Sequence, residues 1–203
     1  PAEELQVLTP TRRGDAGTRS LNFALQAALT PPKPGKQERR FGELVFREGD
    51  RVMQTRNDYD VVWQKEDGTA GTGIFNGDVG KIAKIDPSGE LLEIVFDDRT
   101  ATYTSDMLAE LDMAYAMTVH KAQGSEYRGV VFVGAPCAPS LMVRGVLYTA
   151  ITRARELLVI VGDDSAVNKM AENDRRSRRY SGLKWRLRKG GAGSAFSPCG
   201  GRF

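Results

Sequence analysis

The only histidine of this 203-residue chain, His120, lies in a polar stretch, TVHKAQGSEY, at residues 118–127. The stretch brings an imidazole, an ammonium, an amide and a carboxylate close together, just before the apolar run GVVFVGA. One chemistry for such groups is a nucleophile pair, with His120 as the base for Ser125. No third group to orient the imidazole is visible, so the pair is weakly supported. The structural alternatives are a hydrogen-bonded packing role for His120 and a helix cap at Ser125.

Two further segments contain arginines that could take part in chemistry. Arg12 and Arg13 lie in PTRRGDAG, and Arg153 lies in TAITRAR. A guanidinium is a planar, permanently charged fork that suits the charge of a phosphoryl group. A surface salt bridge or a helix C-cap is the structural alternative for each arginine.

Other kinds of site find little support. One histidine and two distant cysteines, Cys137 and Cys199, predict neither a metal site nor a disulfide framework. The chain has no GxSxG nucleophile elbow, which weakens the hypothesis of a small α/β hydrolase.

The segments around these groups predict an α/β scaffold. Apolar runs predict buried strands at 5–8, 113–117, 129–135 and 157–162. Helical spacing predicts helices from Thr18, over 141–155 and over 165–173, the first with Leu21, Leu25, Ala28 and Leu29 on its apolar face. Strands that alternate with helices indicate an α/β fold with a parallel sheet and helices on both faces. Because ligands bind at the carboxyl ends of parallel strands, we expect PTRRGDAG, TVHKAQGSEY and the helix ending in TAITRAR at one edge.

A pattern of short strands and turns interrupts this scaffold between residues 41 and 111. Short runs such as RVMQT, LLEIVF and TATYT predict strands, and FNGD predicts a tight turn. These features predict a small β-barrel insertion. Three aromatic residues, Tyr59, Trp63 and Phe75, could stack on bases, but we expect them to pack in the barrel core.

Charge is distributed unevenly along the chain. The formal net charge is +3, but nine of the 29 basic residues and no acidic residue lie from Arg175 onward, so the preceding part carries −6. A nucleic-acid arm and a solvated helix that runs into a tail explain this basic end equally well. No apolar run is long enough to cross a membrane, so we expect no membrane partner and a cytoplasmic location.

Together these segments resemble the second motor domain of superfamily 1 DNA helicases of the RecD-like, 5′-to-3′ group. VLTPTRRGDAGTRSLN resembles the family's motif IV, AYAMTVHKAQGSEY its motif V and LYTAITRAR its motif VI. GDRVMQTRND and FNGDVG resemble the stretches that lead into its Src-homology-3-like insertion. The resemblance covers about residues 5–171. It implies a RecA-like motor domain at 1–40 and 112–185 and an insertion at 41–111. The glycine-rich, basic end of the chain has no counterpart in this resemblance, and its composition predicts a flexible tail at 186–203.

The resemblance assigns nucleotide contacts to motifs IV, V and VI. Arg153 is expected to be the arginine finger and Arg12 a second phosphate contact, with Arg13 as the less favoured candidate. Gln123, Gly124 and Glu126 are expected to face the nucleotide, where glycine permits close approach and a carboxylate can accept from ribose hydroxyls.

The resemblance assigns contacts with single-stranded DNA to four other residues. Thr118 and His120 are expected to contact its phosphates, so the polar stretch would join DNA at its first residues to ATP at its last. Arg56 and Asn57 are further candidates for the DNA backbone, with a turn that closes a strand as an equal alternative.

The sequence lacks the motif that would hold the phosphates of ATP and Mg2+. No GxxxxGK[ST] occurs, and PPKPGKQ and RKGGAGSAF have the wrong spacing. We therefore expect the carboxyl-terminal motor half of an ATP-dependent helicase, whose partner is an absent amino-terminal RecA-like domain, and no ATP hydrolysis by this chain alone. Other subunits of a recombination or repair complex are further partners that the resemblance implies. The alternative is a non-catalytic DNA- or protein-binding module derived from such a helicase.

Overall fold

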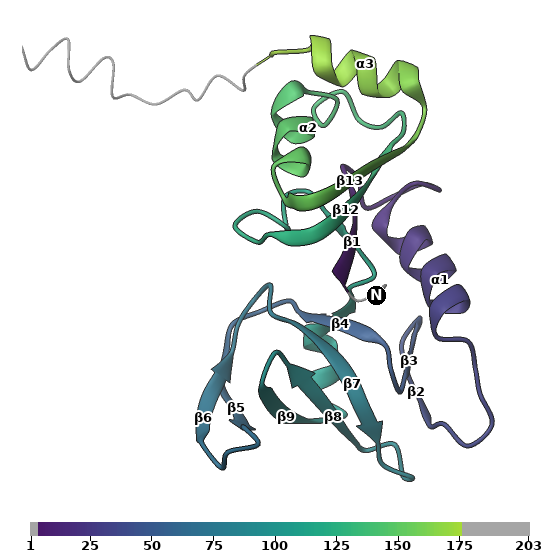
Figure 1. The fold of residues 1–203 in the computed structure, drawn as a ribbon. Helices are drawn as coiled ribbons and strands as arrows, with labels where there is room; N and C mark the ends of the chain where they lie inside the picture. The colour runs from purple at the N-terminus through teal and green to yellow at the C-terminus, as the bar shows by residue number, and fades with distance from the viewer. Residues whose placement is uncertain (1–3, 176–203) are drawn as a thin grey trace, which may run out of the picture.

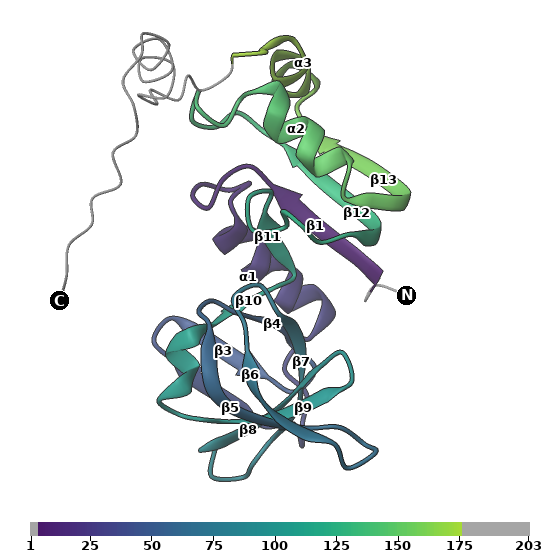
Figure 2. The same ribbon diagram turned by 90° about the vertical axis from the view of Figure 1, so that its left-hand side faces the viewer.

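The computed structural model of the chain describes residues 4–175. The strands β1 (Leu5–Thr9), β11 (Ala116–Thr118), β12 (Tyr127–Gly134) and β13 (Ala154–Gly162) form a parallel sheet in the order β11-β1-β12-β13. This sheet is one lobe of the molecule, and an antiparallel sheet built from the intervening residues is the other (Figures 1 and 2). The predicted basic tail, 186–203, lies outside the described residues.

Helices pack on both faces of the parallel sheet, as predicted. α2 (Arg144–Ile151) and α3 (Asp164–Glu172) cover one face, where Leu8, Val130 and Phe132 are buried. α1 (Thr18–Leu29) contacts β11 and packs on the other face. The β1–α1–β11 and β12–α2–β13 connections run in opposite directions across the sheet, and right-handed crossovers then place α1 and α2 on opposite faces.

The insertion is an antiparallel sheet with its own apolar core. Its sheet order is β10-β4-β7-β8-β9-β5-β6, and a separate hairpin is formed by β2 and β3. The strands are β2 (Glu38–Phe41), β3 (Leu44–Arg47), β4 (Arg51–Gln54), β5 (Asp58–Gln64), β6 (Ala70–Ile74), β7 (Val79–Ile85), β8 (Leu91–Phe96), β9 (Arg99–Thr104) and β10 (Leu111–Met113), with a 3-10 turn, η2 (Met107–Glu110), before β10. Alternate residues of β7, β8 and β9 point into a core that contains Ile82, Leu92 and Tyr103.

Three sequence predictions about elements were wrong. The run 113–117 is not one strand, because β10 ends at Met113 in the insertion sheet and β11 begins at Ala116 in the parallel sheet. The helix expected over 141–155 is shorter, since α2 ends at Ile151 and β13 already begins at Ala154. The run 157–162 belongs to β13 but is not a buried strand, because β13 is an outer strand of its sheet and Leu157 and Ile160 are exposed. Hairpin β2–β3 and strand β5 were not predicted.

The apolar stripe predicted for α1 is only partly buried, since Leu21 and Leu25 are half-buried and Leu25 packs against the insertion core. Leu29 is 53% exposed and Ala28 is exposed, whereas Asn22 and Gln26 are buried. Asn22 Nδ2 donates to the carbonyl oxygens of Met113 and Ala116, and its Oδ1 accepts from the Ala116 N–H at 2.7 Å. The amide thus satisfies backbone groups where the chain passes from one sheet to the other.

A buried carboxylate completes this junction. Asp50, at the start of β4, is fully buried and accepts hydrogen bonds from the Tyr115 hydroxyl (2.8 Å), the Arg47 N–H (2.7 Å) and the Gln26 amide (2.5 Å). Burial raises the pKa of Asp50 above its ordinary value, although these donors act in the opposite direction. The network ties α1, the insertion and the strand that leads to the polar stretch into one unit.

None of the helices in the described part of the chain, residues 4–175, is long and apolar enough to span a membrane.

Candidate functional site

The polar stretch crosses the sheet from one end to the other. It leaves β11 at Thr118, next to Thr9 at the carboxyl end of β1, and enters β12 at Tyr127, at the amino end of the sheet. Between them the chain makes successive turns and no helix, so Ser125 is not a helix cap. Val119 and Ala122 point into the core beneath α2 and hold the crossing against the sheet. The first and last polar residues therefore lie at opposite sheet edges.

Arg153 lies at the amino-end edge, not at the carboxyl edge where it was expected. It directly precedes β13, and its carbonyl oxygen accepts from the Tyr127 N–H at 2.8 Å. Its guanidinium donates to the carbonyl oxygens of Ser125 (2.9 Å) and Thr149 (3.3 Å) and to the Thr152 hydroxyl (3.3 Å). Within residues 4–175, no carboxylate lies at salt-bridge distance from Arg153. Because only neutral acceptors hold this half-buried guanidinium, its positive charge can pair with an external anion.

Three other predicted residues lie beside Arg153. Glu126 forms a 2.7 Å ion pair with Arg155, and both side chains are more than half exposed. Gly124 and Gln123 are exposed in the preceding turn. Gly124 has a φ of +95° and open space where a Cβ would stand, so its backbone geometry favours glycine and leaves the backbone accessible. Sequence reasoning missed Arg155, although it lies in the same TAITRAR string.

Tyr127, at the same edge of the sheet, lies close enough to two arginines for their positive charges to affect its pKa. Burial raises the pKa of Tyr127, whereas the charges of Arg51 and Arg153 act to lower it. Arg51, from β4, donates to the Leu5 carbonyl at 2.9 Å and so reaches the amino end of β1. The amino-end edge therefore combines arginines from the insertion and from the parallel sheet.

The carboxyl-end edge holds a second group of polar residues. Thr118 is 9% exposed, and its hydroxyl oxygen accepts from the Lys121 N–H at 3.3 Å, whereas His120 is exposed. Burial lowers the pKa of Lys121, whereas the charge of Asp112 acts to raise it and that of Arg12 to lower it. Arg12 is 69% exposed and approaches Asp112 at 3.8 Å.

The insertion continues this second group. Thr55 N–H donates to the Glu110 carbonyl at 2.7 Å, and the Arg56 guanidinium approaches the Glu110 carboxylate at 3.9 Å. Asn57 is exposed, and its Oδ1 accepts from the Asn76 N–H at 3.0 Å, so it partly serves the turn that the sequence allowed. Arg12 and Arg56 thus lie along one ridge that is linked through the segment 110–112.

The structure does not bring Arg12 to Arg153. Leu5, Gly129 and Leu157 lie side by side across the sheet. Arg153 lies before this line and Arg12 lies beyond the far end of β1, a separation on the order of 20 Å at about 3.3 Å per strand residue. The topology thus places the two arginines at opposite ends of the strands, which contradicts the expectation of a shared edge. The contact of both guanidinium groups with one nucleotide stays a prediction.

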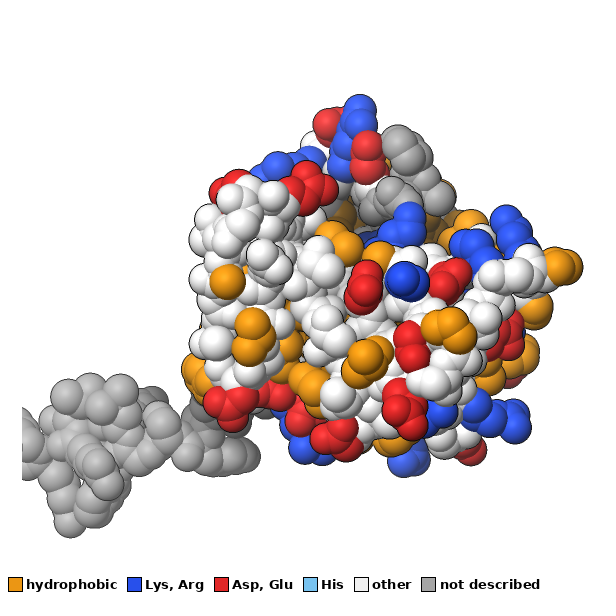
Figure 3. All heavy atoms as spheres, turned by 90° about the horizontal axis from the view of Figure 1, so that it is seen from below, with side chains coloured by type: hydrophobic (Ala, Val, Ile, Leu, Met, Phe, Trp, Pro, Cys, Tyr) orange, Lys and Arg blue, Asp and Glu red, His pale blue; other side chains and the backbone are white. Residues whose placement is uncertain are grey.

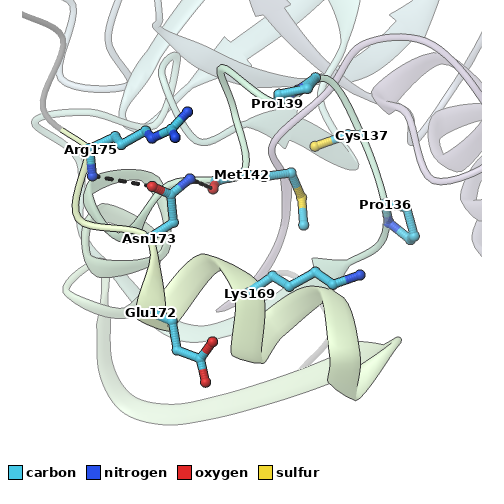
Figure 4. A pocket seen from close by; sticks show the side chains of 8 residues that line it. All are labelled: Pro136, Cys137, Pro139, Met142, Lys169, Glu172, Asn173 and Arg175. Carbon is cyan, nitrogen blue, oxygen red and sulfur yellow. Dashed lines mark hydrogen bonds between the residues drawn. The ribbon is translucent and has the colours of Figure 1, made fainter.

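A cavity of about 560 Å3 lies apart from both groups, between α3 and the loop that follows β12 (Figure 4). Cys137, Met142 and Lys169 line it, and Asn173 closes one side by donating to the Met142 carbonyl at 2.7 Å. None of the site residues that the sequence predicted lines this cavity.

Family models match two parts of the chain. Residues 21–96 match the SH3 domain of ATP-dependent RecD-like DNA helicases, and residues 113–161 match the UvrD-like helicase C-terminal domain. The second match contains the whole polar stretch and Arg153.

Relatives and solved structures agree with these matches. The chain is 37% identical over 180 residues to the ATP-dependent RecD2 DNA helicase of Deinococcus radiodurans, covering 89% of the chain and 23% of that protein. It is 30% identical over 192 residues to the RecBCD enzyme subunit RecD of Mycolicibacterium smegmatis, covering 93% of the chain and 30% of that subunit. The chain thus spans less than a third of these relatives.

The fold is similar to that of a Pif1 helicase solved in a study of DNA unwinding at forked DNA. The TM-score is 0.52 at 16% identity, over 94% of this chain and 45% of that one. Bacteroides Pif1 in complex with ADP-AlF3 and single-stranded DNA gives a TM-score of 0.50 at 16% identity, over 92% and 46%. At this identity the likeness shows the fold alone.

Proposed function

Because this chain belongs to the RecD-like helicases, we propose that it is the carboxyl-terminal motor half of an ATP-dependent helicase that translocates on single-stranded DNA. The observation that carries the proposal is the path of residues 118–127, which joins two polar groups at opposite ends of the sheet. One end would serve the nucleotide and the other the DNA.

The amino-end edge is suited to the phosphates of a nucleotide held by another domain. Arg153 is oriented by the Ser125 and Thr149 carbonyls, and no carboxylate within residues 4–175 pairs with its positive charge. A preorganised guanidinium stabilises the charge that develops on a transferring phosphoryl group. Glu126, Gly124 and Gln123 would line the same nucleotide, and Mg2+ would be held with the phosphates by the other domain.

The carboxyl-end edge is suited to the DNA backbone. His120 is exposed there, and Thr118 retains a hydroxyl hydrogen to donate. Since Arg12 lies on this side, we assign it to a DNA phosphate in place of the nucleotide phosphate that the sequence suggested. Its contact with Asp112 is longer than a hydrogen bond, as is that of Arg56 with Glu110, so both guanidinium groups can turn toward a phosphate.

This arrangement couples nucleotide state to movement. When ATP lies between the two domains, Arg153 draws them together, and loss of the γ-phosphate removes much of that attraction. The crossing 118–127 transmits the change because Val119 and Ala122 anchor it in the core beneath α2. If the grip on DNA alternates between the domains, repeated closing and opening becomes stepping along the strand.

The names of the relatives support a setting for the longer protein. The Mycolicibacterium relative is a subunit of the RecBCD enzyme. This supports a place for the longer protein among the subunits of a recombination or repair complex.

The 203-residue chain is expected to bind single-stranded DNA without turning over ATP. Contacts made mainly to phosphates predict binding that is largely independent of base sequence and that weakens steeply with salt. The double substitution Arg12→Ala with Arg56→Ala should flatten the dependence of log affinity on log salt by about 1.4, at ~0.7 per lost contact with a single strand. Fluorescence anisotropy with labelled oligonucleotides over a salt series measures this slope.

Arg128→Ala is the matched control, because Arg128 is also exposed but lies near the amino-end edge, paired with Glu4 and Glu156. It should leave the slope unchanged. An equal loss in both variants, or DNA-stimulated ATP hydrolysis by the chain alone, would contradict the proposed division of labour.

A further inference from the structure

Two aromatic side chains of the insertion are exposed, contrary to the core packing expected from the sequence. Tyr59 is 65% exposed and Phe75 is 40% exposed, and their ring centroids lie 5.5 Å apart at an interplanar angle of 71°. Trp63, the third aromatic residue, does pack against the insertion core, as expected. Exposure of a paired tyrosine and phenylalanine leaves a large apolar contact surface open to solvent.

Local backbone features hold the pair outward. The pairing of β5 with β6 shifts register between Asp58 and Val62, and such a bulge re-aims the side chains within it. Gly73 makes room for the Phe75 ring, because a Cβ at that position would lie 2.9 Å from Phe75 Cζ. β6 is also the last strand of the insertion sheet, so it pairs with β5 on one side and with no strand of that sheet on the other.

The pair adjoins the polar ridge at the carboxyl-end edge. Phe75 precedes Asn76, whose N–H donates to Asn57 Oδ1 at 3.0 Å. Asn57 follows Arg56, which approaches Glu110, and the same segment carries Asp112 beside Arg12. These contacts therefore lead step by step from the rings, in the insertion, to Arg56 and on to Arg12, which follows β1 of the parallel sheet.

Composition favours stacking over a purely electrostatic contact on this surface. The acidic residues Asp58, Asp60, Glu110 and Asp112 accompany the arginines, so the ridge is not a strongly basic field. The face of the molecule seen from below in Figure 3 mixes both charge signs, and its hydrophobic side chains are scattered. The Tyr59–Phe75 pair is distinguished by two aromatic rings in contact at an exposed edge.

We propose that the Tyr59–Phe75 pair is a base-stacking site for single-stranded DNA, whose phosphates run on toward Arg56 and Arg12. This rests on the proposed function and adds a contact with the bases. Every base presents a π face, so aromatic stacking strengthens binding with little preference for sequence. The rings would hold one end of the bound segment while the ridge holds its backbone.

The test compares normal and abasic oligonucleotides of roughly 12 nucleotides, within the range bound by one small domain. With the 203-residue chain, Tyr59→Ala and Phe75→Ala should each weaken binding to oligothymidylate about tenfold. Neither substitution should change binding to an abasic strand of the same length, because its phosphates remain but its bases are gone. Tyr59→Phe, which keeps the ring, should retain the parental affinity.

Val62→Ala is the matched control, since Val62 lies on the same strand and is 63% exposed. It should leave binding to both strands unchanged. A second measurement needs no substitution: irradiation of the parent chain with 5-iodouracil-containing DNA should cross-link Tyr59 or Phe75.

The outcomes separate the stacking site from the proposed function. Equal losses on normal and abasic strands, no loss on either strand, or cross-links confined to other residues would overturn the stacking site while DNA binding stands. Failure of the parent chain to bind either strand would overturn the DNA-binding function together with the stacking site.

Discussion

Replacement of Arg153 by alanine is expected to lower ATP turnover by about 10³-fold in a helicase that joins this segment to its phosphate-binding domain. The reason is geometric: the guanidinium is fixed by the Ser125 and Thr149 carbonyls and has no carboxylate partner within residues 4–175. Nucleotide and DNA binding should be largely retained, because the interaction acts mainly in the transition state. Steady-state ATPase kinetics with saturating DNA measure the effect.

Arg128→Ala is again the appropriate control, because this arginine is exposed near the same edge but already pairs with Glu4 and Glu156. Its removal should change turnover less than twofold, at ~0.4 kcal/mol or less in the barrier. Parental turnover in the Arg153→Ala protein would refute the role of the arginine.

The largest expected effect on stability concerns the buried carboxylate at the junction between the sheets. Asp50→Ala removes a fully buried acceptor that binds the Tyr115 hydroxyl, the Arg47 N–H and the Gln26 amide. We expect the free energy of unfolding to fall by about 3 kcal/mol. Tyr115→Phe, which removes a single donor to Asp50, should cost about 1 kcal/mol. Equilibrium urea unfolding of both variants checks the ratio, and equal losses would show that Asp50 does not organise the network.

The same carboxylate makes stability depend on pH in a defined direction. Burial raises the pKa of Asp50 in the folded state above its ordinary value of 3.8. The stability it contributes is therefore complete below pH 3.8 and is lost as the pH rises through the raised value. Relative to Asp50→Asn, which cannot ionise, the free energy of unfolding of the parent should fall as the pH rises from 3.8 through the raised pKa. The pKa of Asp67 is lowered, mainly by the hydrogen bond from the Thr69 N–H. Relative to Asp67→Asn, the parent should therefore gain stability as the pH rises, which is the opposite trend.

The elements of the parallel sheet could be predicted because their sequences carry local signals. Apolar runs located β1, β12 and β13, and the cap at Asp163 lies within two residues of the expected start of α3. The buried polar residues of α1 could not be predicted from apolar periodicity. Asn22 and Gln26 bind backbone and carboxylate groups some 20 or more positions away, and only the assembled junction supplies those partners.

Residues of the candidate site could be named from the sequence, but their places in the sheet could not. Arg153, Ser125 and Glu126 come together because β12 and β13 begin side by side. The expectation of a single edge failed for a topological reason: the crossing 118–127 carries its last residues back to the amino ends of the strands. The exposed pair Tyr59–Phe75 escaped prediction because sequence alternation does not reveal the β-bulge that contains Tyr59, nor that β6 ends just before Phe75.

The central claim is that DNA and nucleotide are bound at opposite ends of one sheet, and hydrogen exchange of the 203-residue chain with and without single-stranded DNA tests it most directly. We predict slower exchange of backbone amides at 55–57 and 118–121 when DNA is bound. Amides at 151–155, beside Arg153, should exchange at unchanged rates. Protection confined to 151–155 and 123–126, with none at 118–121, would contradict the account.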